Sequence, residues 1–176
     1  MGVGLLGYLY VGTPVQRITI AYDTGSDWTT FDTDLCANCP SPYFTTKSST
    51  TYKNVSSTIY ALNYNGLSLK GVVARDNLGL LSTGAFTTND FTFFAMTNQA
   101  GLTTTYDGIL GLSRPYYSLN FTTGPLFNQA LKNTSMISQD VFSLYISPTI
   151  SYINFGAVNN SAIKSGSYLS YITMPS

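Results

Sequence analysis

The sequence has 176 residues, a length that fits one domain with a sizeable buried core. Only 9% of the residues are charged, and eight Lys and Arg balance eight Asp and Glu. This balance excludes the basic surface of a nucleic-acid-binding protein, so no nucleic-acid partner is expected. His and Glu are both absent, which excludes Ser-His-Asp and Cys-His catalysis and any His-ligated metal site. Neither a metal site nor a cofactor is therefore expected.

The secondary structure expected from the sequence is mostly β. Segments rich in Val, Ile, Thr, Tyr and Phe recur at short spacing, separated by Gly, Asn and Ser. These predicted strands are 8–11, 16–22, 58–64, 71–80, 86–95, 141–146, 151–155 and 167–173. Residues 41–57 are polar and are expected to form a long surface loop. One short helix is predicted over 126–132, where Pro125 precedes the first turn and four apolar residues share one face, and at most one more is expected.

One motif carries most of the chemical information. An apolar strand over 18–22 runs directly into Asp23-Thr24-Gly25-Ser26, which places a carboxylate on a tight turn. The tripeptide alone also fits a simple turn in which Asp23 caps Gly25. The surrounding sequence has to decide between these two interpretations.

Five motifs, in order along residues 8–174, resemble those of pepsin-like aspartic proteases. Val11-Gly12-Thr13-Pro14 with Gln16 resembles the approach to the first catalytic loop, and Asp23-Thr24-Gly25-Ser26 resembles that loop. The other three are Tyr64 with Gly71, Tyr106-Asp107-Gly108-Ile109-Leu110-Gly111-Leu112, and Ser138 to Tyr145 with Ile153-Asn154-Phe155-Gly156. The resemblance implies a closed, barrel-like β lobe with one or two short helices. It also implies hydrolysis of polypeptide substrates by an aspartate pair that shares one proton and activates a water molecule.

The resemblance assigns a role to each residue of the catalytic loop. Asp23 would be one member of the aspartate pair, and Thr24 would anchor the loop backbone. Gly25 would allow the turn and expose its amide. Ser26 would donate a hydrogen bond to the outer oxygen of Asp23.

The resemblance also predicts a flap, formed by Tyr64, Gly66 and Ser68, that covers the substrate. Tyr106 and Ile109 would line substrate subsites. The alternative for Tyr64, which the resemblance makes the less favoured one, is an ordinary strand aromatic among 14 tyrosines, whereas core packing accounts equally well for Ile109. Trp28 follows the catalytic loop after one residue, whereas the family's flap-bracing Trp stands several residues further along.

A second Asp-Thr-Gly, which the family carries in its C-terminal lobe, does not occur in this sequence. We therefore interpret residues 1–176 as a single N-terminal lobe that lacks its C-terminal lobe, and that lobe is the expected partner. The segment 168–174 would then lack the strands with which it pairs. Two alternatives stay open: an inactive pepsin-like binding module, and a homodimeric protease in which each chain donates Asp23.

Cys36 and Cys39 could form a redox pair, half of a zinc site or a small disulfide loop. The resemblance favours the disulfide.

Four Asn-x-Ser/Thr sequons, at Asn54, Asn120, Asn133 and Asn159, suit a glycoprotein. Together with the resemblance they predict a secreted or a vacuolar/lysosomal protein.

Overall fold

The computed structural model describes residues 5–40, 43–64, 66–83, 88–101, 106–114 and 127–173. The strands are β1 Leu6–Val11, β2 Gln16–Asp23, β3 Thr30–Asp32, β4 Lys53–Asn54, β5 Tyr60–Tyr64, β6 Leu67–Gly79, β7 Thr88–Ala100, β8 Gly108–Gly111, β9 Phe142–Ile146 and β10 Ser151–Phe155. The helix α1 spans Phe127–Asn133, and single 3-10 turns cover Thr46–Ser48 and Asn160–Ala162. The described residues are thus mostly β, as the sequence predicts.

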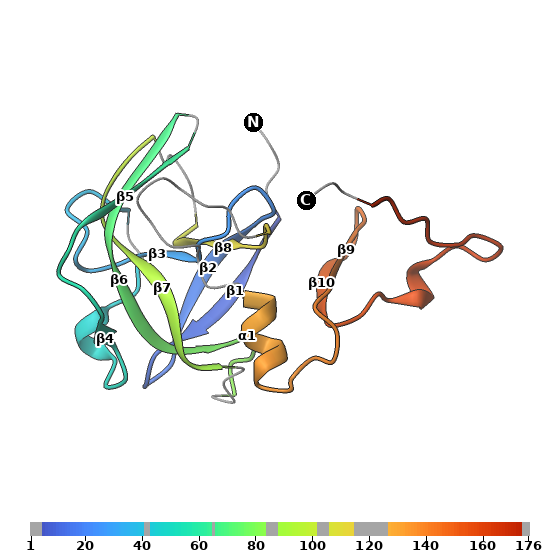
Figure 1. The fold of residues 1–176 in the computed structure, drawn as a ribbon, viewed down its shortest axis with the longest axis horizontal. Coiled ribbons are helices and arrows are strands. Elements are labelled where there is room, and N and C mark those ends of the chain that lie inside the picture. Colours follow the sequence, from blue (N-terminus) through green and yellow to red (C-terminus); the bar gives the residue numbers. More distant parts are fainter. Residues whose placement is uncertain are drawn as a thin grey trace.

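Six strands close into a barrel in the order β1-β2-β8-β3-β7-β6, and β6 pairs again with β1 (Figure 1). The closing contact is short: Tyr10 lies opposite Gly79 and Val11 opposite Leu78. β5 and β4 attach to β6 outside this ring. The expected barrel-like lobe is confirmed.

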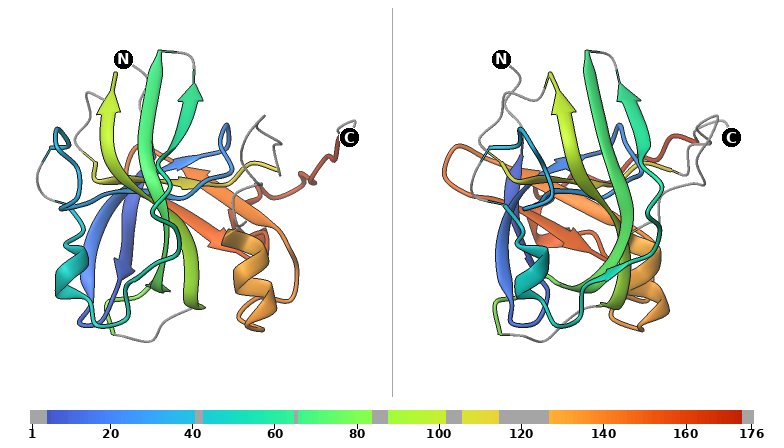
Figure 2. Two further views of the ribbon diagram at one scale, coloured as in Figure 1. Left: turned by 60° about the vertical axis from the view of Figure 1, so that its left-hand side comes forward. Right: turned by 90° about the vertical axis from the view of Figure 1, so that its left-hand side faces the viewer.

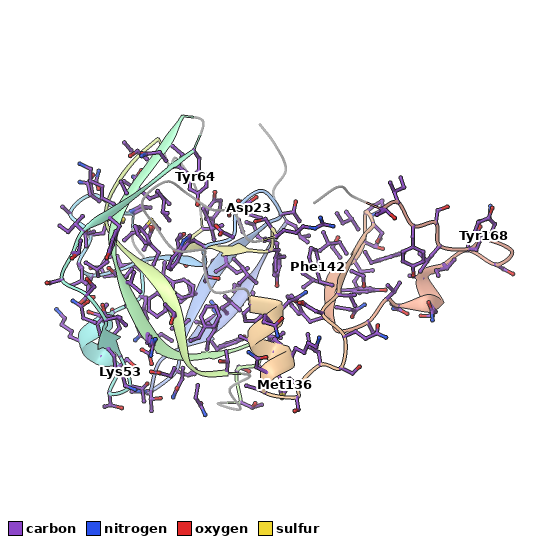
Figure 3. All side chains as sticks on the ribbon, in the orientation of Figure 1. Asp23, Lys53, Tyr64, Met136, Phe142 and Tyr168 are labelled. Atoms are coloured by element: carbon purple, nitrogen blue, oxygen red, sulfur yellow. A yellow bond between two sulfur atoms is a disulfide. The ribbon has the colours of Figure 1, made fainter. Side chains whose placement is uncertain are left out.

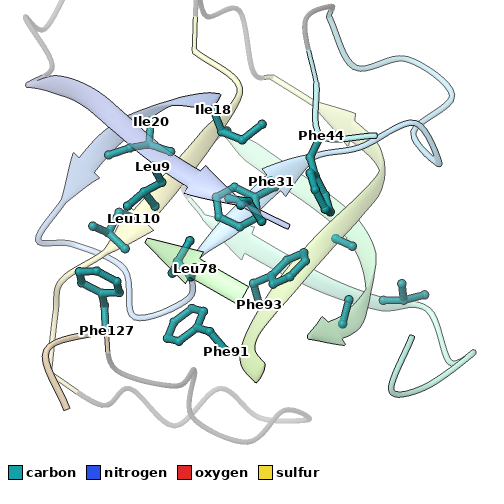
Figure 4. Close-up of a cluster of buried hydrophobic side chains, with 14 of the residues drawn as sticks. Leu9, Ile18, Ile20, Phe31, Phe44, Leu78, Phe91, Phe93, Leu110 and Phe127 are labelled. Carbon is teal, nitrogen blue, oxygen red and sulfur yellow. The ribbon is translucent and has the colours of Figure 1, made fainter. Parts of the chain in front are cut away.

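Alternating apolar residues along the strands fill the barrel (Figure 4). Leu9 and Val11 of β1, Ile18 and Ile20 of β2, and Leu110 of β8 all point into this core. Because each fully buried side chain of this size contributes about 1.5–3 kcal/mol, burial of the strand pattern stabilises the ring. Phe31, Phe44 and Phe93 form a cluster of rings, with centroids 4.9–6.5 Å apart.

Helix α1 lies against the barrel (Figure 2). Its side chains Phe127 and Leu131 are almost completely buried. The Phe127 ring meets Phe91 of β7 edge to face, with centroids 5.9 Å apart. Its other neighbour is Phe155 of β10, at 5.3 Å. The helix therefore connects the barrel to the C-terminal hairpin.

The two strands β9 and β10 form a separate antiparallel sheet beside the barrel. An isolated two-stranded sheet is only marginally stable in water. Several of its apolar residues are exposed, including Leu144, Ile146 and, in the connecting turn, Ile150. This part of the molecule presents apolar surface to solvent.

Two expectations about secondary structure are wrong. Residues 167–173 form no strand, and Tyr171 and Ile172 are 84% and 86% exposed. No strand of the described chain pairs with this segment, so its backbone takes part in no ladder. The segment 41–57 is not simply a surface loop either: where it is described it contains β4, a 3-10 turn and the fully buried Phe44.

Candidate active site

The backbone of Asp23 is fixed by the end of the barrel strand that carries it. β2 runs parallel to β8, and Asp23 lies opposite Gly111. The Leu112 N–H donates to the Asp23 carbonyl at 2.8 Å. The carboxylate therefore stands at the end of a buried strand pair, in a half-exposed position.

Both oxygens of this carboxylate accept a hydrogen bond from the loop that follows. The Gly25 N–H donates to Oδ1 at 2.9 Å, and the Ser26 hydroxyl donates to Oδ2 at 2.6 Å. Hydrogen bonds to a carboxylate are stronger than those between neutral groups, and two of them fix its orientation. A Cβ on Gly25 would lie 3.2 Å from Oδ1, so glycine keeps this oxygen accessible.

The catalytic loop lies in close contact with β8 at a second glycine, Gly111. A Cβ on Gly111 would lie 2.5–2.8 Å from backbone atoms of Asp27 and Trp28, a contact that backbone atoms cannot relieve. The Ser113 N–H also donates to the Ser26 carbonyl at 3.0 Å. The Gly in Ile-Leu-Gly is thus required for the close approach of the two segments.

The anchoring role expected for Thr24 stays a prediction. Its side chain is exposed, and its hydroxyl makes no hydrogen bond to the described part of the chain. The loop backbone is instead anchored by Gly25, Ser26 and the N–H groups of Leu112 and Ser113. Among the described residues, the contacts that hold the loop backbone come from these neighbours of Thr24.

The predicted flap residues lie on the hairpin of β5 and β6, which projects at one end of the barrel. Gly66 has φ +79°, a backbone conformation that favours glycine in the turn. The Ser68 hydroxyl donates to Asn63 Oδ1 across the hairpin at 2.8 Å. Asn65 lies outside the described residues. Tyr64 closes the hairpin opposite Leu67.

The Tyr64 side chain lies on the same side of the molecule as Asp23 (Figure 3). Burial raises the pKa of the Tyr64 phenol to about 12, with further contributions from the carboxylates of Asp27 and Asp23. The phenol is therefore protonated at every pH below this value and can donate a hydrogen bond. The structure brings together Asp23, Ser26 and Tyr64 from segments about 40 residues apart.

Trp28 packs against this hairpin, although it stands closer to the catalytic loop in the sequence than the family's flap-bracing Trp. It lies in a buried cluster with Leu62, Leu69, Phe94 and Met96, against which Tyr64 packs. Its ring meets Phe94 at 6.1 Å in an edge-to-face arrangement. Sequence reasoning missed this role. It also missed Asp27, which is buried and whose carboxylate contributes to the raised pKa of Tyr64. The signal available was their position directly after the Asp-Thr-Gly-Ser loop.

The two predicted subsite residues flank the start of β8. Tyr106 is half-buried, and Ile109 is 7% exposed, opposite Ala21 of β2 and Thr30 of β3. Ile109 belongs to neither buried apolar cluster, whereas the adjacent Leu110 belongs to the barrel core. Ile109 therefore faces away from that core.

A cavity of about 470 Å³ lies between the end of β8, α1 and the start of β9. Its lining includes Arg114, Asn128 and Asp140, but no residue of the catalytic loop or of the hairpin. This cavity is therefore distinct from the surface above Asp23.

Cys36 and Cys39 are joined by a disulfide in the loop after β3. The Asn38 amide between them donates to the Gln99 carbonyl at 2.7 Å and fastens this loop to β7. Within the described residues, no group of three or more His, Cys, Asp or Glu could hold a metal ion. None of the described helices has the length and apolarity needed to cross a membrane.

Comparison with known families decides the assignment. The eukaryotic aspartyl protease family matches residues 5–174, almost the whole sequence. The chain belongs to this family. The observed barrel and the Asp-Thr-Gly loop at the end of β2 agree with the membership that the sequence motifs predict.

Curated relatives of this aspartyl protease chain include pepsins from several vertebrates. Rabbit (Oryctolagus cuniculus) pepsin II-2/3 is 29% identical over 88% of this chain and 41% of its own length. Sheep (Ovis aries) pregnancy-associated glycoprotein 6 is 32% identical over 90% of this chain and 42% of its own. Chicken (Gallus gallus) pepsin A is 28% identical over 96% and 47%. The chain spans less than half the length of these relatives.

Proposed function

We propose that this chain is one lobe of an aspartic endopeptidase and supplies Asp23, half of the catalytic pair. The observation that carries the proposal is the carboxylate of Asp23, held by one donor on each oxygen beneath the Tyr64 hairpin. No other aspartate of the sequence is followed by Thr-Gly. The second aspartate is therefore proposed to come from a second lobe.

The chemistry requires both carboxyl groups. In aspartic proteases two carboxyls about 3 Å apart cannot both ionise, so they share one proton. The ionised group removes a proton from a water molecule, whose oxygen attacks the scissile carbonyl carbon. The protonated group donates to the carbonyl oxygen, and the C–N bond breaks when the leaving nitrogen is protonated. Asp23 alone supplies one of these two functions.

The polypeptide substrate would lie between Asp23 and the hairpin that carries Tyr64, Gly66 and Ser68. The protonated phenol of Tyr64 can donate a hydrogen bond to this space. Ile109 faces away from the barrel core, which supports a role in an apolar subsite beside Tyr106.

The proposed partner of the chain is a C-terminal lobe that covers the β9–β10 hairpin and the segment 168–173. Exposed apolar residues concentrate there, among them Ile146, Tyr171 and Ile172. The relatives are more than twice as long as the matched region, which supports such a lobe. We place the protein in a secretory or vacuolar/lysosomal route, because the structure contains a disulfide and one relative is named a glycoprotein.

The decisive experiment measures peptide cleavage at acid pH by the chain joined to the proposed C-terminal lobe. Wild-type protein should cleave, and Asp23→Asn should lose at least about a thousandfold in kcat/KM, because the substitution keeps the shape and removes the acid–base chemistry. Asp90→Asn is the matched control, since Asp90 is exposed and pairs with Lys53 and Arg75. It should retain full activity.

Three outcomes would contradict the proposal. Near-wild-type turnover by the Asp23→Asn protein would exclude Asp23 from the chemistry. Binding of peptides without cleavage by the two-lobed protein would favour the inactive binding module. Cleavage by a verified dimer of this chain alone, abolished by Asp23→Asn, would favour the homodimeric enzyme. The chain as a monomer should have no peptidase activity.

A further inference from the structure

The structure distinguishes between the sequons by the hydrogen bonds of their asparagine amides. Asn120 lies outside the described residues. Asn133 ends α1, and its Oδ1 accepts a hydrogen bond from the Gln129 amide at 2.9 Å. Asn54 and Asn159 give the sharpest contrast. Glycosylation takes place at the amide nitrogen, so the partners of Nδ2 are the relevant observation.

The side chain of Asn159 is fully engaged inside the C-terminal segment. Its Nδ2 donates to the Tyr152 hydroxyl at 2.7 Å. Its Oδ1 accepts from the Ser161 backbone N–H at 3.0 Å and from the Ser161 hydroxyl at 2.6 Å. Tyr152 is itself stacked on Tyr145, with ring centroids 5.0 Å apart. A sugar on this half-buried nitrogen would have to displace the tyrosine.

The side chain of Asn54 has the opposite arrangement. The residue is exposed on β4, and its Oδ1 accepts from the Ser56 backbone N–H at 3.1 Å. Its Nδ2 has no hydrogen-bond partner among the described residues. The amide oxygen of Asn54 therefore has a partner, while the nitrogen that would carry a sugar belongs to an exposed side chain.

Asn54 also lies at an edge that benefits from being covered. β4 is the last strand of its sheet and pairs only with β6, where Asn54 lies opposite Ala74. Two apolar residues that follow it in the sequence, Val55 and Ile59, are 48% and 62% exposed. Unpaired edges with exposed apolar side chains favour association between molecules. A bulky hydrophilic sugar at Asn54 would shield this edge.

We propose that Asn54 is an N-glycosylation site and that Asn159 remains unmodified. The reaction takes an oligosaccharide from a polyprenyl-diphosphate donor through the transferase of the secretory pathway. The Nδ2 atom forms a bond to C1 of the first sugar while the bond from C1 to the diphosphate oxygen breaks. One proton leaves the nitrogen and is taken up by the diphosphate or by solvent. The inference rests on the secretory route proposed above.

The test uses the full chain with a cleavable secretion signal, expressed in a eukaryotic host. Asn120→Gln and Asn133→Gln are present throughout, so that only the two contrasted sequons remain. The secreted protein is treated with peptide N-glycosidase in water enriched in heavy oxygen, and its peptides are weighed. Each formerly glycosylated asparagine then appears as a heavy aspartate. The supplied signal makes the result independent of the native compartment and of peptidase activity.

We expect the heavy label at residue 54 in most molecules and none at residue 159. Ser56→Ala should remove the glycan, and Ser56→Thr, which restores the hydroxyl of the sequon, should retain it. The Thr variant also shows that loss in the Ala variant is not a folding defect. Absence of label at Asn54, or equal labelling at Asn159, would overturn the proposal.

Discussion

The backbone N–H of Asp32 donates a hydrogen bond to the carbonyl oxygen of Asp107 at 2.7 Å, which holds two buried aspartates side by side. Asp107 Oδ2 accepts from the Thr19 N–H at 2.9 Å. Both carboxyl oxygens of Asp32 lack a hydrogen-bond partner among the described residues, and the side chain is 0% exposed. Burial, with a smaller contribution from Asp107, raises the pKa of Asp32 to about 7.

Asp32 should therefore make the fold less stable at neutral pH than at acid pH. The pKa of Asp32 is higher in the folded than in the unfolded protein, so its protonated form favours the folded state. This contribution to stability is fully present below about pH 4 and is lost as the pH rises through 7. Between pH 4 and 8 the free energy of unfolding of the wild-type protein should fall by on the order of 3 kcal/mol because of Asp32. In the Asp32→Asn protein this fall should be absent. Urea unfolding at several pH values would measure it.

The control for this prediction is Asp90→Asn, because the pKa of Asp90 is shifted in the opposite direction. Hydrogen bonding to Lys53 and the charges of Lys53 and Arg75 lower the pKa of Asp90, so its contribution is present at neutral pH and lost on acidification. Asp90 is exposed, so the effect should be small. An unchanged pH profile in the Asp32→Asn protein would show that Asp32 is not the buried acid responsible.

Ser26→Ala should weaken the two-lobed enzyme without abolishing its activity. The substitution removes the 2.6 Å hydrogen bond to Asp23 Oδ2 and leaves the Gly25 N–H on Oδ1. Loss of one such bond corresponds to roughly a tenfold fall in kcat/KM. Ser82→Ala, at an exposed loop residue, should leave the rate unchanged. A loss as large as that of Asp23→Asn would assign Ser26 a more direct part in the chemistry.

Trp28→Ala should destabilise the chain by about 3–5 kcal/mol and raise KM, because it removes the ring on which the hairpin rests. Phe44→Ala is the matched control: Phe44 is fully buried in the barrel core, in the cluster that does not contact Tyr64. It should lower stability comparably and leave KM unchanged under conditions in which the protein is folded. Equal KM values in both variants would exclude a role for Trp28 in substrate binding.

Replacing both Cys36 and Cys39 by Ser should lower the free energy of unfolding by about 2 kcal/mol or less, since the disulfide closes a ring of only four residues. The protein should still fold, because Asn38 and Gln99 also fasten the loop to β7. Denaturant unfolding gives the stability difference. Free thiols at both positions in native protein from a secretory host would contradict the prediction.

The chain by itself should self-associate at micromolar concentration. Tyr171 and Ile172 are exposed, and the two-stranded sheet of β9 and β10 has unpaired edges. Light scattering should show particles larger than a monomer, and a C-terminal lobe added in trans should reduce them. The double substitution Tyr171→Ser and Ile172→Ser should also reduce the self-association. A monodisperse monomer of the unmodified chain would show that the lobe is self-sufficient.

The sequence predicted the parts of the fold that depend on local pattern. The alternating segments that became β1, β2, β9 and β10 were placed within two residues, and the short helix was displaced by one. The strands β3 and β8 were missed because Thr30–Asp32 and Gly108–Gly111 are too short to show a period and are defined by their neighbours. The strand expected at 167–173 depended on partner strands that the described chain does not contain.

The candidate site was predictable where a motif stands on contiguous residues, as at Asp23, Gly25 and Ser26. It was not predictable where tertiary packing decides the role. Trp28 contacts the hairpin because it packs in a cluster with residues 62, 69, 94 and 96, which are distant from it in the sequence. Its position after the catalytic loop was a signal, but it did not identify these partners. Thr24 fits the motif, but its hydroxyl makes no hydrogen bond to a described residue, so its role stays a prediction.

Trp28 is also the single tryptophan of the sequence. Its position beneath the Tyr64 hairpin means that the near-ultraviolet emission of the whole protein originates largely from one indole at the candidate site. Any movement of the hairpin would change the polarity around that indole, because Tyr64 packs against the cluster that contains it. The molecule thus carries an intrinsic optical reporter at the candidate site, by which changes around the Tyr64 hairpin can be followed without a label.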